Sequence, residues 1–264
     1  MKRRQLLQYA GTGVLSAIAT TWVLSWNPSA AQSPENAVTI QFLGHTCFLF
    51  TGNGVRILVN PFRNLGCTDQ YRLPQIEADI VLISSQLLDE GAAIDIPGNP
   101  QILYEPGVFQ FRGIEFQGIS IDHDREGGRR FGKNVAWRWT QSGVNILHLG
   151  GAAAPISIEE KILMGRPDVA LIPVGGGPKA YNAVEARDAM AVLNPKVAIP
   201  THYRTEAAND SCDLAPVDEF LKLVQGQPVK QINYDKIAIK PGDLRNLGEN
   251  TPAIRVLSHQ NALK

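Results

Sequence analysis

Short apolar runs separated by turn residues fill the first half of the chain. The runs 38–44, 46–52 and 55–62 follow one another with glycine-containing breaks. Closely spaced runs of this length predict an antiparallel meander of strands. Residues 78–85 (ADIVLISS) are apolar almost throughout, which is typical of a strand covered on both faces. The same criteria predict strands within 101–106, 108–122 and 135–151, the last a hairpin that turns near 141–143.

The second half alternates between helical and strand patterns. Ser157 and Glu160 have capping-box spacing at one predicted helix start, and so do Asn182 and Glu185 at the next. Helices are predicted within 155–167, 182–195 and 216–226, and strands within 168–176, 196–203 and 229–242.

This order of elements predicts the domain organisation. A strand meander that leads into alternating strands and helices favours one α/β domain with two sheets, over residues 37–242. The chain has no Pro/Gly/Ser-rich linker and no internal repeat that would divide it. Residues 243–264 are weakly patterned and predict a loosely held tail.

The first 31 residues are expected to lie outside this domain. A basic start is followed by a modest apolar run from about Ala10 to Trp26, then by small residues suited to cleavage before Gln32. The Arg3-Arg4 pair, with Gly and Thr in the apolar run, is typical of twin-arginine export signals. An ordinary secretory signal or an uncleaved anchor is the alternative. Residues 1–31 therefore predict export to the periplasm or an equivalent lumenal compartment.

Composition and charge narrow the classes of function. The chain has 264 residues, of which 44% are hydrophobic and 19% charged, as in ordinary globular proteins. Its 25 basic and 25 acidic residues leave no net charge to attract nucleic acid. No later apolar stretch approaches the length of a membrane span. The mature protein is expected to be soluble, with no nucleic-acid partner and no membrane span.

Three cysteines are an odd number for an exported protein. Cys47 lies in an apolar, strand-like run and is predicted to be a buried free thiol. Cys67 and Cys212 both lie in polar loops. They could pair in an oxidising compartment, and two unpaired thiols are the alternative.

Histidines give the first indication of a site. Four of the five, His45, His123, His148 and His202, come at the end of a strand-like run. Ligand sites in open α/β sheets gather at strand ends. These four could therefore share a site, although a lone histidine in such a position is usually structural.

Two segments carry a resemblance to a known family. The first, IQFLGHTCFLFTGNGVRILVNPF, places a Gly-His before one strand and Asn60-Pro-Phe after the next. The second runs from PDVALIPVGGG through a helix to NPKVAIPTHY. From Val38 to Tyr203 the chain thus resembles the metallo-β-lactamase superfamily, in its branch of lactonase-like and uncharacterised metal-dependent hydrolases, where an Asp stands at position 60. The resemblance implies an α/β fold: a four-layer αβ/βα sandwich of two mixed sheets with helices outside, and a site at one edge between the sheets.

The resemblance also implies two metal ions, usually zinc, bridged by a hydroxide that attacks a lactone, ester, amide or phosphodiester. At the first ion, Ser85 and Leu87 replace two of the family's three histidines, and the third matches His123. Gly151 replaces the bridging aspartate, and His148 matches a position that is not normally a ligand. A conventional two-metal site is therefore not expected.

More of the second ion's ligand set is kept. Asp89 and His202 match family ligands, and Glu90 replaces the histidine beside Asp89. One imidazole and two carboxylates suit iron(II), manganese or calcium at least as well as zinc. One divalent ion (Zn, Mn or Fe) could be held by Asp89, Glu90 and His202, with His123 nearby. The expected catalytic residues are Asp89 and His123, the latter as proton donor or substrate clamp.

The loop at residues 84–90, which contains Asp89 and Glu90, also has an interpretation without metal. Ser84 or Ser85 could cap a following helix, with residues 89–90 in its first turn, where negative charge complements the helix dipole. Leu87 and Leu88 would then pack inward.

A serine mechanism is a further option. Ser84 or Ser85 could lie near His45, His123 or His202 and attack an acyl group. No Gly-x-Ser-x-Gly elbow surrounds either serine.

The leading hypothesis is an exported, hydrolase-like protein with a degenerate metal site, which binds a small molecule in the sheet-edge cleft or has a scaffolding role. The alternative is an active hydrolase of a lactone, ester or phosphodiester that uses the single ion. In the implied fold, Cys67 and Cys212 flank the mouth of the site. A disulfide between them would brace its rim and stabilise the fold by on the order of 4 kcal/mol.

Overall fold

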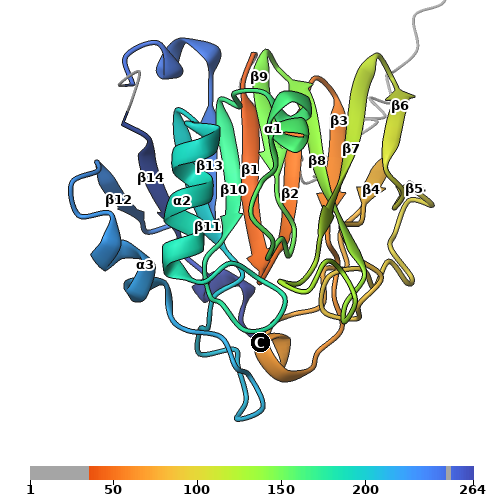
Figure 1. The fold of residues 1–264 in the computed structure, drawn as a ribbon. Helices are drawn as coiled ribbons and strands as arrows, with labels where there is room; N and C mark the ends of the chain where they lie inside the picture. Colours follow the sequence, from red (N-terminus) through yellow and green to blue (C-terminus); the bar gives the residue numbers. More distant parts are fainter. Residues whose placement is uncertain (1–35, 248–250) are drawn as a thin grey trace, which may run out of the picture. The chain divides into compact units, whose positions relative to one another are not determined.

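The computed structural model describes residues 36–247 and 251–264, which form two mixed β-sheets (Figure 1). The predicted export signal at residues 1–31 lies outside the described residues. The first sheet has six strands, in the order β13 (Lys236–Ile239), β1 (Val38–Gly44), β2 (Cys47–Gly52), β3 (Val55–Val59), β4 (Ile80–Leu82) and β5 (Gln101–Leu103). The second has eight, in the order β12 (Val229–Ile232), β14 (Ala253–Leu257), β11 (Val197–Thr201), β10 (Val169–Pro173), β9 (Val144–His148), β8 (Lys133–Gln141), β7 (Ile114–Asp122) and β6 (Gly107–Phe111).

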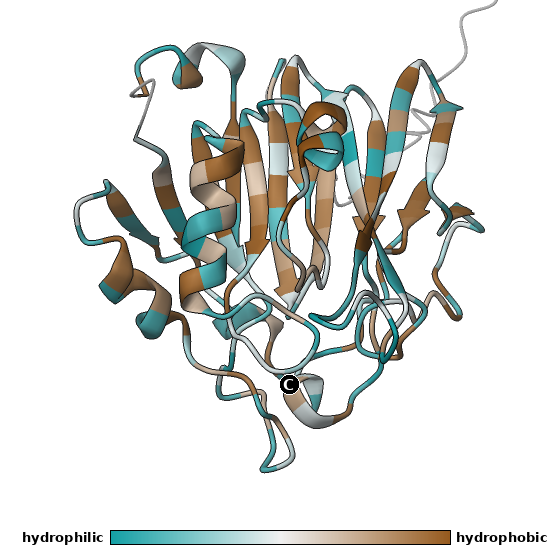
Figure 2. Ribbon diagram, viewed as in Figure 1, coloured by the Kyte–Doolittle hydropathy of each residue, from teal (hydrophilic) through white to brown (hydrophobic). Residues whose placement is uncertain are grey.

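The main hydrophobic core lies between the two sheets. Alternate residues of β1 point into it, and Phe50 of β2 meets Trp139 of β8 edge-on, with ring centroids 4.8 Å apart. Figure 2 shows that apolar residues recur along the strands. Trp137 also donates a 3.0 Å hydrogen bond from Nε1 to the carbonyl of Ile83, which ties β8 to the end of β4. Burial of two inner faces against each other is what makes such a sandwich stable.

The three α-helices of the described residues pack on the outer face of the eight-stranded sheet, where Met164, Met190 and Phe220 are buried with its side chains (Figure 1). The helices are α1 (Ile158–Met164), α2 (Ala183–Leu193) and α3 (Val217–Leu223). Both predicted capping boxes, at the starts of α1 and α2, are confirmed.

Loops cover the outer face of the six-stranded sheet. Phe62, Tyr71 and Ala207 lie in these loops and pack on Leu49 and Leu58. The predicted two-sheet α/β sandwich is confirmed, and within the described residues this outer layer contains 3₁₀ turns but no α-helix. The 3₁₀ turns of the structure are η1 (Gly66–Thr68), η2 (Pro241–Leu244) and η3 (Gln260–Ala262).

Two predictions about the C-terminal part are wrong. Residues 229–242 form two strands, β12 and β13, that belong to different sheets, because the chain turns at 233–235. The predicted loose tail contains β14, which lies between β11 and β12, with Ile254 fully buried. The last residue donates from its backbone N–H to Gln70. The domain therefore extends beyond residue 242 to the end of the chain.

Among the described residues, no helix has the length and apolarity that crossing a membrane requires.

Candidate metal centre

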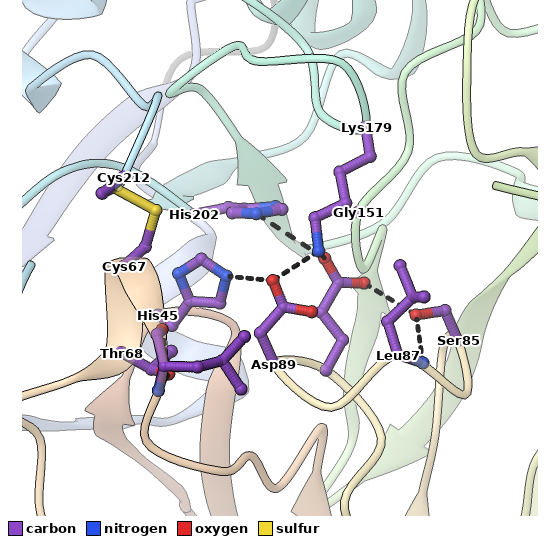
Figure 3. A network of polar contacts seen from close by, with 12 residues as sticks. His45, Cys67, Thr68, Ser85, Leu87, Asp89, Gly151, Lys179, His202 and Cys212 are labelled. Carbon is purple, nitrogen blue, oxygen red and sulfur yellow. Dashed lines mark hydrogen bonds and ion pairs between the residues drawn. A yellow bond between two sulfur atoms is a disulfide. The ribbon is translucent and has the colours of Figure 1, made fainter. Parts of the chain in front are cut away.

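Three side chains converge at the edge of the sandwich. One ligand atom from each of His45, Glu90 and His202 lies within 4.8 Å of the others, and all three residues are buried. Glu90 Oε1 is 3.6 Å from His202 Nε2. Figure 3 labels His45 and His202 of this group, together with Asp89 and Lys179. Two imidazoles and a carboxylate in such proximity form a typical ligand set for a transition-metal ion.

The two histidines are held by unusual backbone conformations at strand ends. His45 follows β1 with φ 56°, and His202 follows β11 with φ 53°. Left-handed conformations at residues other than glycine cost about 1–3 kcal/mol each and tend to occur at functional sites. The His202 backbone N–H donates to the His45 carbonyl at 3.2 Å. The two imidazole rings meet edge-on, with their centroids 4.1 Å apart. These contacts join the two sheets at the site.

A tight turn after β4 brings Glu90 into the group. The backbone N–H groups of Glu90 and Gly91 both donate to the Leu87 carbonyl, at 3.0 and 2.7 Å. Glu90 is 0% exposed and accepts a 3.2 Å hydrogen bond from Ser85 Oγ. Leu88, by contrast, is 57% exposed. The helix-cap interpretation of this loop is therefore wrong: no helix follows within the described residues 84–100, and the acidic side chain points inward while Leu88 points outward.

Glu90 occupies the space beside Gly151. A Cβ atom on Gly151 would lie 2.6 and 2.7 Å from the two Glu90 carboxylate oxygens, and closer still to His123 Nε2. His123 Nε2 itself lies 3.4 Å from Glu90 Oε2. The resemblance implies a bridging aspartate at position 151. The carboxylate of Glu90 lies in the space that such a side chain would occupy.

Asp89 has a different partner from its neighbour. Its carboxylate forms an ion pair with the ammonium of Lys179, and Oδ2 is 4.0 Å from His45 Nε2. Lys179 Nζ also lies 4.0 Å from Glu90 Oε1. Lys179 and Asp89 are 17% and 15% exposed, whereas the side chains of His45, Glu90 and His202 are at most 1% exposed. The Lys179–Asp89 pair therefore forms the solvent-facing side of the group.

The electrostatics favour the ligand forms of these side chains. Burial alone would raise the pKa of Glu90, but His123, His202 and Lys179 hold that pKa well below its ordinary value. Burial lowers the pKa of His45, and burial together with the His45 ring lowers the pKa of His202. An ionised carboxylate and neutral imidazoles are the protonation states that bind metal ions.

Several buried polar atoms of the group have no hydrogen-bond partner among the described residues. They include both ring nitrogens of His45, His123 and His202, and Oε1 of Glu90. Buried polar atoms are almost always satisfied by protein, water or a ligand. A bound ion would satisfy the nitrogens and the oxygen that face one another here.

His148 is the exception among the four strand-end histidines. Its Nδ1 accepts from the Gly150 N–H at 3.0 Å, and its Nε2 therefore donates to the Thr46 carbonyl at 3.1 Å. Burial lowers its pKa to about 4, although the bond to Thr46 opposes this. Both ring nitrogens of His148 form hydrogen bonds with backbone groups, so this residue has a structural role. The other three strand-end histidines gather at the site.

The residues present fit one metal ion and not two. His45, Glu90 and His202 would supply three ligands, the number that the protein provides in catalytic zinc sites. A second ion would need Leu87, which has no ligand atom, and a carboxylate at Gly151, which has no side chain.

The predicted site residues are thus only partly brought together. Glu90 and His202 lie in the ligand group, and His123 contacts Glu90. Asp89 is paired with Lys179 instead. His45 was expected only as one of four strand-end histidines that could share a site, and Lys179 was assigned no role. The position of His45 directly after a strand was the one available signal, and Lys179 had none beyond its place after a glycine turn.

The serine option receives no support from the contacts. Ser85 Oγ donates to Glu90, and its other hydrogen bond comes from the Leu87 N–H. Neither Ser84 nor Ser85 forms a hydrogen bond with a histidine in the described part of the chain.

The prediction for Cys47 is confirmed, and of the two alternatives for Cys67 and Cys212 the structure has the paired one. Cys67 and Cys212 form a disulfide with a Cα–Cα distance of 4.7 Å, and Cys47 is a buried free thiol. The disulfide joins the loop after β3 to the loop after β11, which begins with His202, and Figure 3 draws it with the site residues. It thus links two of the loops that surround the ligand group.

The sequence is similar to a known domain family and to named relatives from archaea. Residues 39–202, more than half of the chain, match the family model described as the β-lactamase superfamily domain. A UPF0173 metal-dependent hydrolase of Thermococcus onnurineus is 28% identical over 239 residues, which cover 80% of this chain and 100% of the relative. A UPF0173 metal-dependent hydrolase of Thermoplasma acidophilum is 24% identical over 189 residues, 61% of this chain and 81% of the relative.

The fold is also similar to that of solved structures. One, from Thermotoga maritima, is assigned to the metallo-β-lactamase superfamily as a zinc-dependent hydrolase. It has a TM-score of 0.65 and 26% identity, and the match covers 83% of this chain and 98% of that one. Igni18, a metallo hydrolase of Ignicoccus hospitalis, has a TM-score of 0.58 and 17% identity over 86% of this chain and 97% of its own, which shows a shared fold.

Proposed function

We propose that this chain, which belongs to the β-lactamase superfamily, is an exported hydrolase that works with one metal ion. The observation that carries the proposal is the convergence of His45, Glu90 and His202, with ligand atoms that have no other partner among the described residues. The names of the relatives from Thermococcus and Thermoplasma, both metal-dependent hydrolases, support the same class of activity.

A divalent ion held by these three side chains would act as a Lewis acid on the substrate and lower the pKa of a water molecule. The protein's own groups would do the rest. Glu90 lies between His123 and His202, so its carboxylate can orient both rings. His123, with Nε2 3.4 Å from Glu90, is placed to hold or move a proton at that atom.

The accessible side of the site indicates how a substrate would enter. Only Lys179 and Asp89 reach solvent at this group, so a small molecule would approach past that ion pair. The proposed substrate is a small molecule with a lactone, ester or phosphodiester bond. Scaffolding would not require the buried ligand group.

Export is proposed from two features. The first 31 residues have the order of a basic, an apolar and a small-residue segment, with an arginine pair. The Cys67–Cys212 disulfide is typical of proteins in oxidising compartments. Together they support a periplasmic or equivalent lumenal location.

A second candidate function is binding of a small molecule, without metal, at the group formed by His45, Glu90 and His202. Lys179 favours it, because its ammonium already provides a positive charge beside Asp89 and near Glu90. In that case the three imidazoles would be satisfied by water or by the ligand itself.

Metal analysis combined with a hydrolase panel separates the two. The purified protein, Glu90→Ala and His202→Ala would be assayed for metal content and for turnover of lactone, ester and phosphodiester substrates. His259→Ala serves as the matched control, since His259 pairs with Glu206 and lies outside the ligand group. The hydrolase proposal expects metal and turnover in the wild type and the control, and loss of both in the two site variants. Turnover that survives Glu90→Ala and His202→Ala would overturn it.

A further inference from the structure

Tyr71 connects the two segments that carry the histidines of the ligand group. It lies in the loop between β3 and β4, is only 1% exposed, and packs in a small core with Phe62. Its hydroxyl group forms a 2.7 Å hydrogen bond with the hydroxyl of Thr205, three residues after His202. The hydrolase chemistry proposed above assigns this residue no role.

The ring of Tyr71 lies against the backbone just before His45. A Cβ atom on Gly44 would lie 2.7 Å from Cγ of the ring and 2.9 Å from both Cδ atoms. Gly44 has φ 118°, a conformation that favours glycine, and His45 follows with φ 56°. A side chain at position 44 would therefore displace the ring. This close contact fixes the ring on the peptide unit that leads into His45.

The hydroxyl group of Tyr71 acts on the same two segments. Burial raises the pKa of Tyr71 to about 12, and the Thr205 hydroxyl and the His45 backbone oppose that shift. The hydroxyl group therefore keeps its proton at neutral pH and can donate a hydrogen bond. Buried tyrosine hydroxyls usually have such a partner.

The loop that carries Tyr71 is itself held on both sides. The Gln70 backbone N–H donates at 2.8 Å to the carbonyl of Ala207, in the segment that follows His202. On its other side, Tyr71 forms a β-bridge with Leu263 near the C-terminus. Because these contacts fix the loop, the Tyr71 side chain can hold its neighbours in one arrangement.

We propose that Tyr71 is a positioning residue, which holds the strand ends that present His45 and His202 at the separation at which both can bind one ion. The inference rests on the proposed function for the ion alone. The contact that Tyr71 maintains is the hydrogen bond from the His202 N–H to the His45 carbonyl, which can be measured in the metal-free protein. Removal of groups that orient metal ligands typically lowers metal affinity by roughly 10–100-fold.

The first test is amide hydrogen exchange, followed by NMR in the metal-free protein. Tyr71→Phe keeps the ring and removes the hydroxyl group. We expect the His202 amide to exchange about tenfold faster relative to the amide of Leu171, a fully buried residue of β10. A general loss of stability would accelerate both amides equally through global unfolding, so the ratio of the two rates is the readout.

The second test is the affinity for Co²⁺, whose visible absorption reports on its coordination. Tyr71→Phe should bind Co²⁺ about tenfold more weakly than the wild type, with an altered spectrum. Thr205→Val removes the other hydroxyl group of the same hydrogen bond and should reproduce both effects, even if Tyr71→Phe folds poorly by circular dichroism. The double variant should resemble either single variant, because both substitutions remove one bond.

Val144→Ala is the matched control. Val144 is fully buried and lies at the turn of the β8–β9 hairpin, at the opposite end of β9 from His148. This substitution should lower the stability of the fold without changing the ratio of exchange rates or the affinity for Co²⁺. A change in the ratio as large as that of Tyr71→Phe would argue against a specific role for Tyr71.

The outcomes separate this inference from the proposed function. A faster His202 amide and weaker Co²⁺ binding in Tyr71→Phe and Thr205→Val support both. A faster amide in those variants, with a wild type that binds no Co²⁺, supports the role of Tyr71 in holding the strand ends and contradicts the one-ion centre. An unchanged ratio of exchange rates in both variants, or an unchanged affinity in a protein that binds Co²⁺, overturns the inference.

Discussion

Gly151→Ala tests whether position 151 is empty in order to make room for Glu90. The added Cβ would lie 2.6 and 2.7 Å from the Glu90 oxygens, where real Cβ contacts essentially never occur, and it would also meet His123. Glu90 and His123 are both fully buried and cannot swing into solvent. The carboxylate must therefore move within the core.

The substitution should lower both the stability of the fold and the affinity for metal. Overpacking a buried site by one carbon typically destabilises a protein by about 1–3 kcal/mol. For a chain of this size, each kcal/mol lowers Tm by roughly 2–4 °C, so a fall of about 2–12 °C is expected. Because the displaced group is a proposed ligand, metal affinity should fall by about tenfold or more, as it does when ligand orientation is lost.

The assay is thermal unfolding followed by circular dichroism, together with a zinc competition titration. Gly226→Ala is the matched control, because nothing lies within 4 Å of a Cβ at that position. The control should keep the Tm and the zinc affinity of the wild type. A Gly151→Ala protein with unchanged Tm and unchanged affinity would refute the claim that Glu90 fills this space.

Two further predictions concern the loops that flank the site. Replacing Cys67 and Cys212 together by alanine should lower the free energy of unfolding by about 5 kcal/mol, from the chain-entropy relation applied to a sequence separation of 145; a loss under about 1 kcal/mol in urea unfolding would contradict it. Asp124 accepts hydrogen bonds from four backbone N–H groups, which, against the effect of burial, lower its pKa from 3.8 to about 2. The ionised form is therefore stabilised by folding, and the stability deficit of Asp124→Asn should be full above pH 4 and disappear as the pH falls toward 2. Urea unfolding of both proteins across that range checks this, and a deficit that does not vary with pH would argue against it.

Much of the fold follows from the hydrophobic pattern. The meander of β1–β3, the hairpin of β8 and β9 and the capped starts of α1 and α2 all carry local signals of period, turn and cap. β14 was missed because the five residues after Pro252, four of them apolar, have no local signal of their own. Its stability comes from pairing with β11 and β12, whose positions are set by the rest of the sheet.

The sequence predicted which types of residue form the site better than it predicted which of their side chains contact one another. Asp89 and Glu90 are adjacent in the sequence and were assigned to one ion, but the turn at 87–91 sends them to different partners. His45 enters the ligand group only because the ends of β1 and β11 meet across the two sheets. Gly151 was interpreted as the loss of a ligand, and the geometry adds that Glu90 and His123 fill the space beside it.

The most direct test of the one-ion centre is the metal content of His45→Gln beside that of the wild type. His45 separates this centre from the expected set of Asp89, Glu90 and His202, since only the observed geometry makes it a ligand. The wild type and His259→Ala should each carry one equivalent of a divalent metal per chain, and His45→Gln, folded by circular dichroism, should carry less than a tenth of that. A wild type without metal, or a His45→Gln protein that keeps a full equivalent, would contradict the proposed centre.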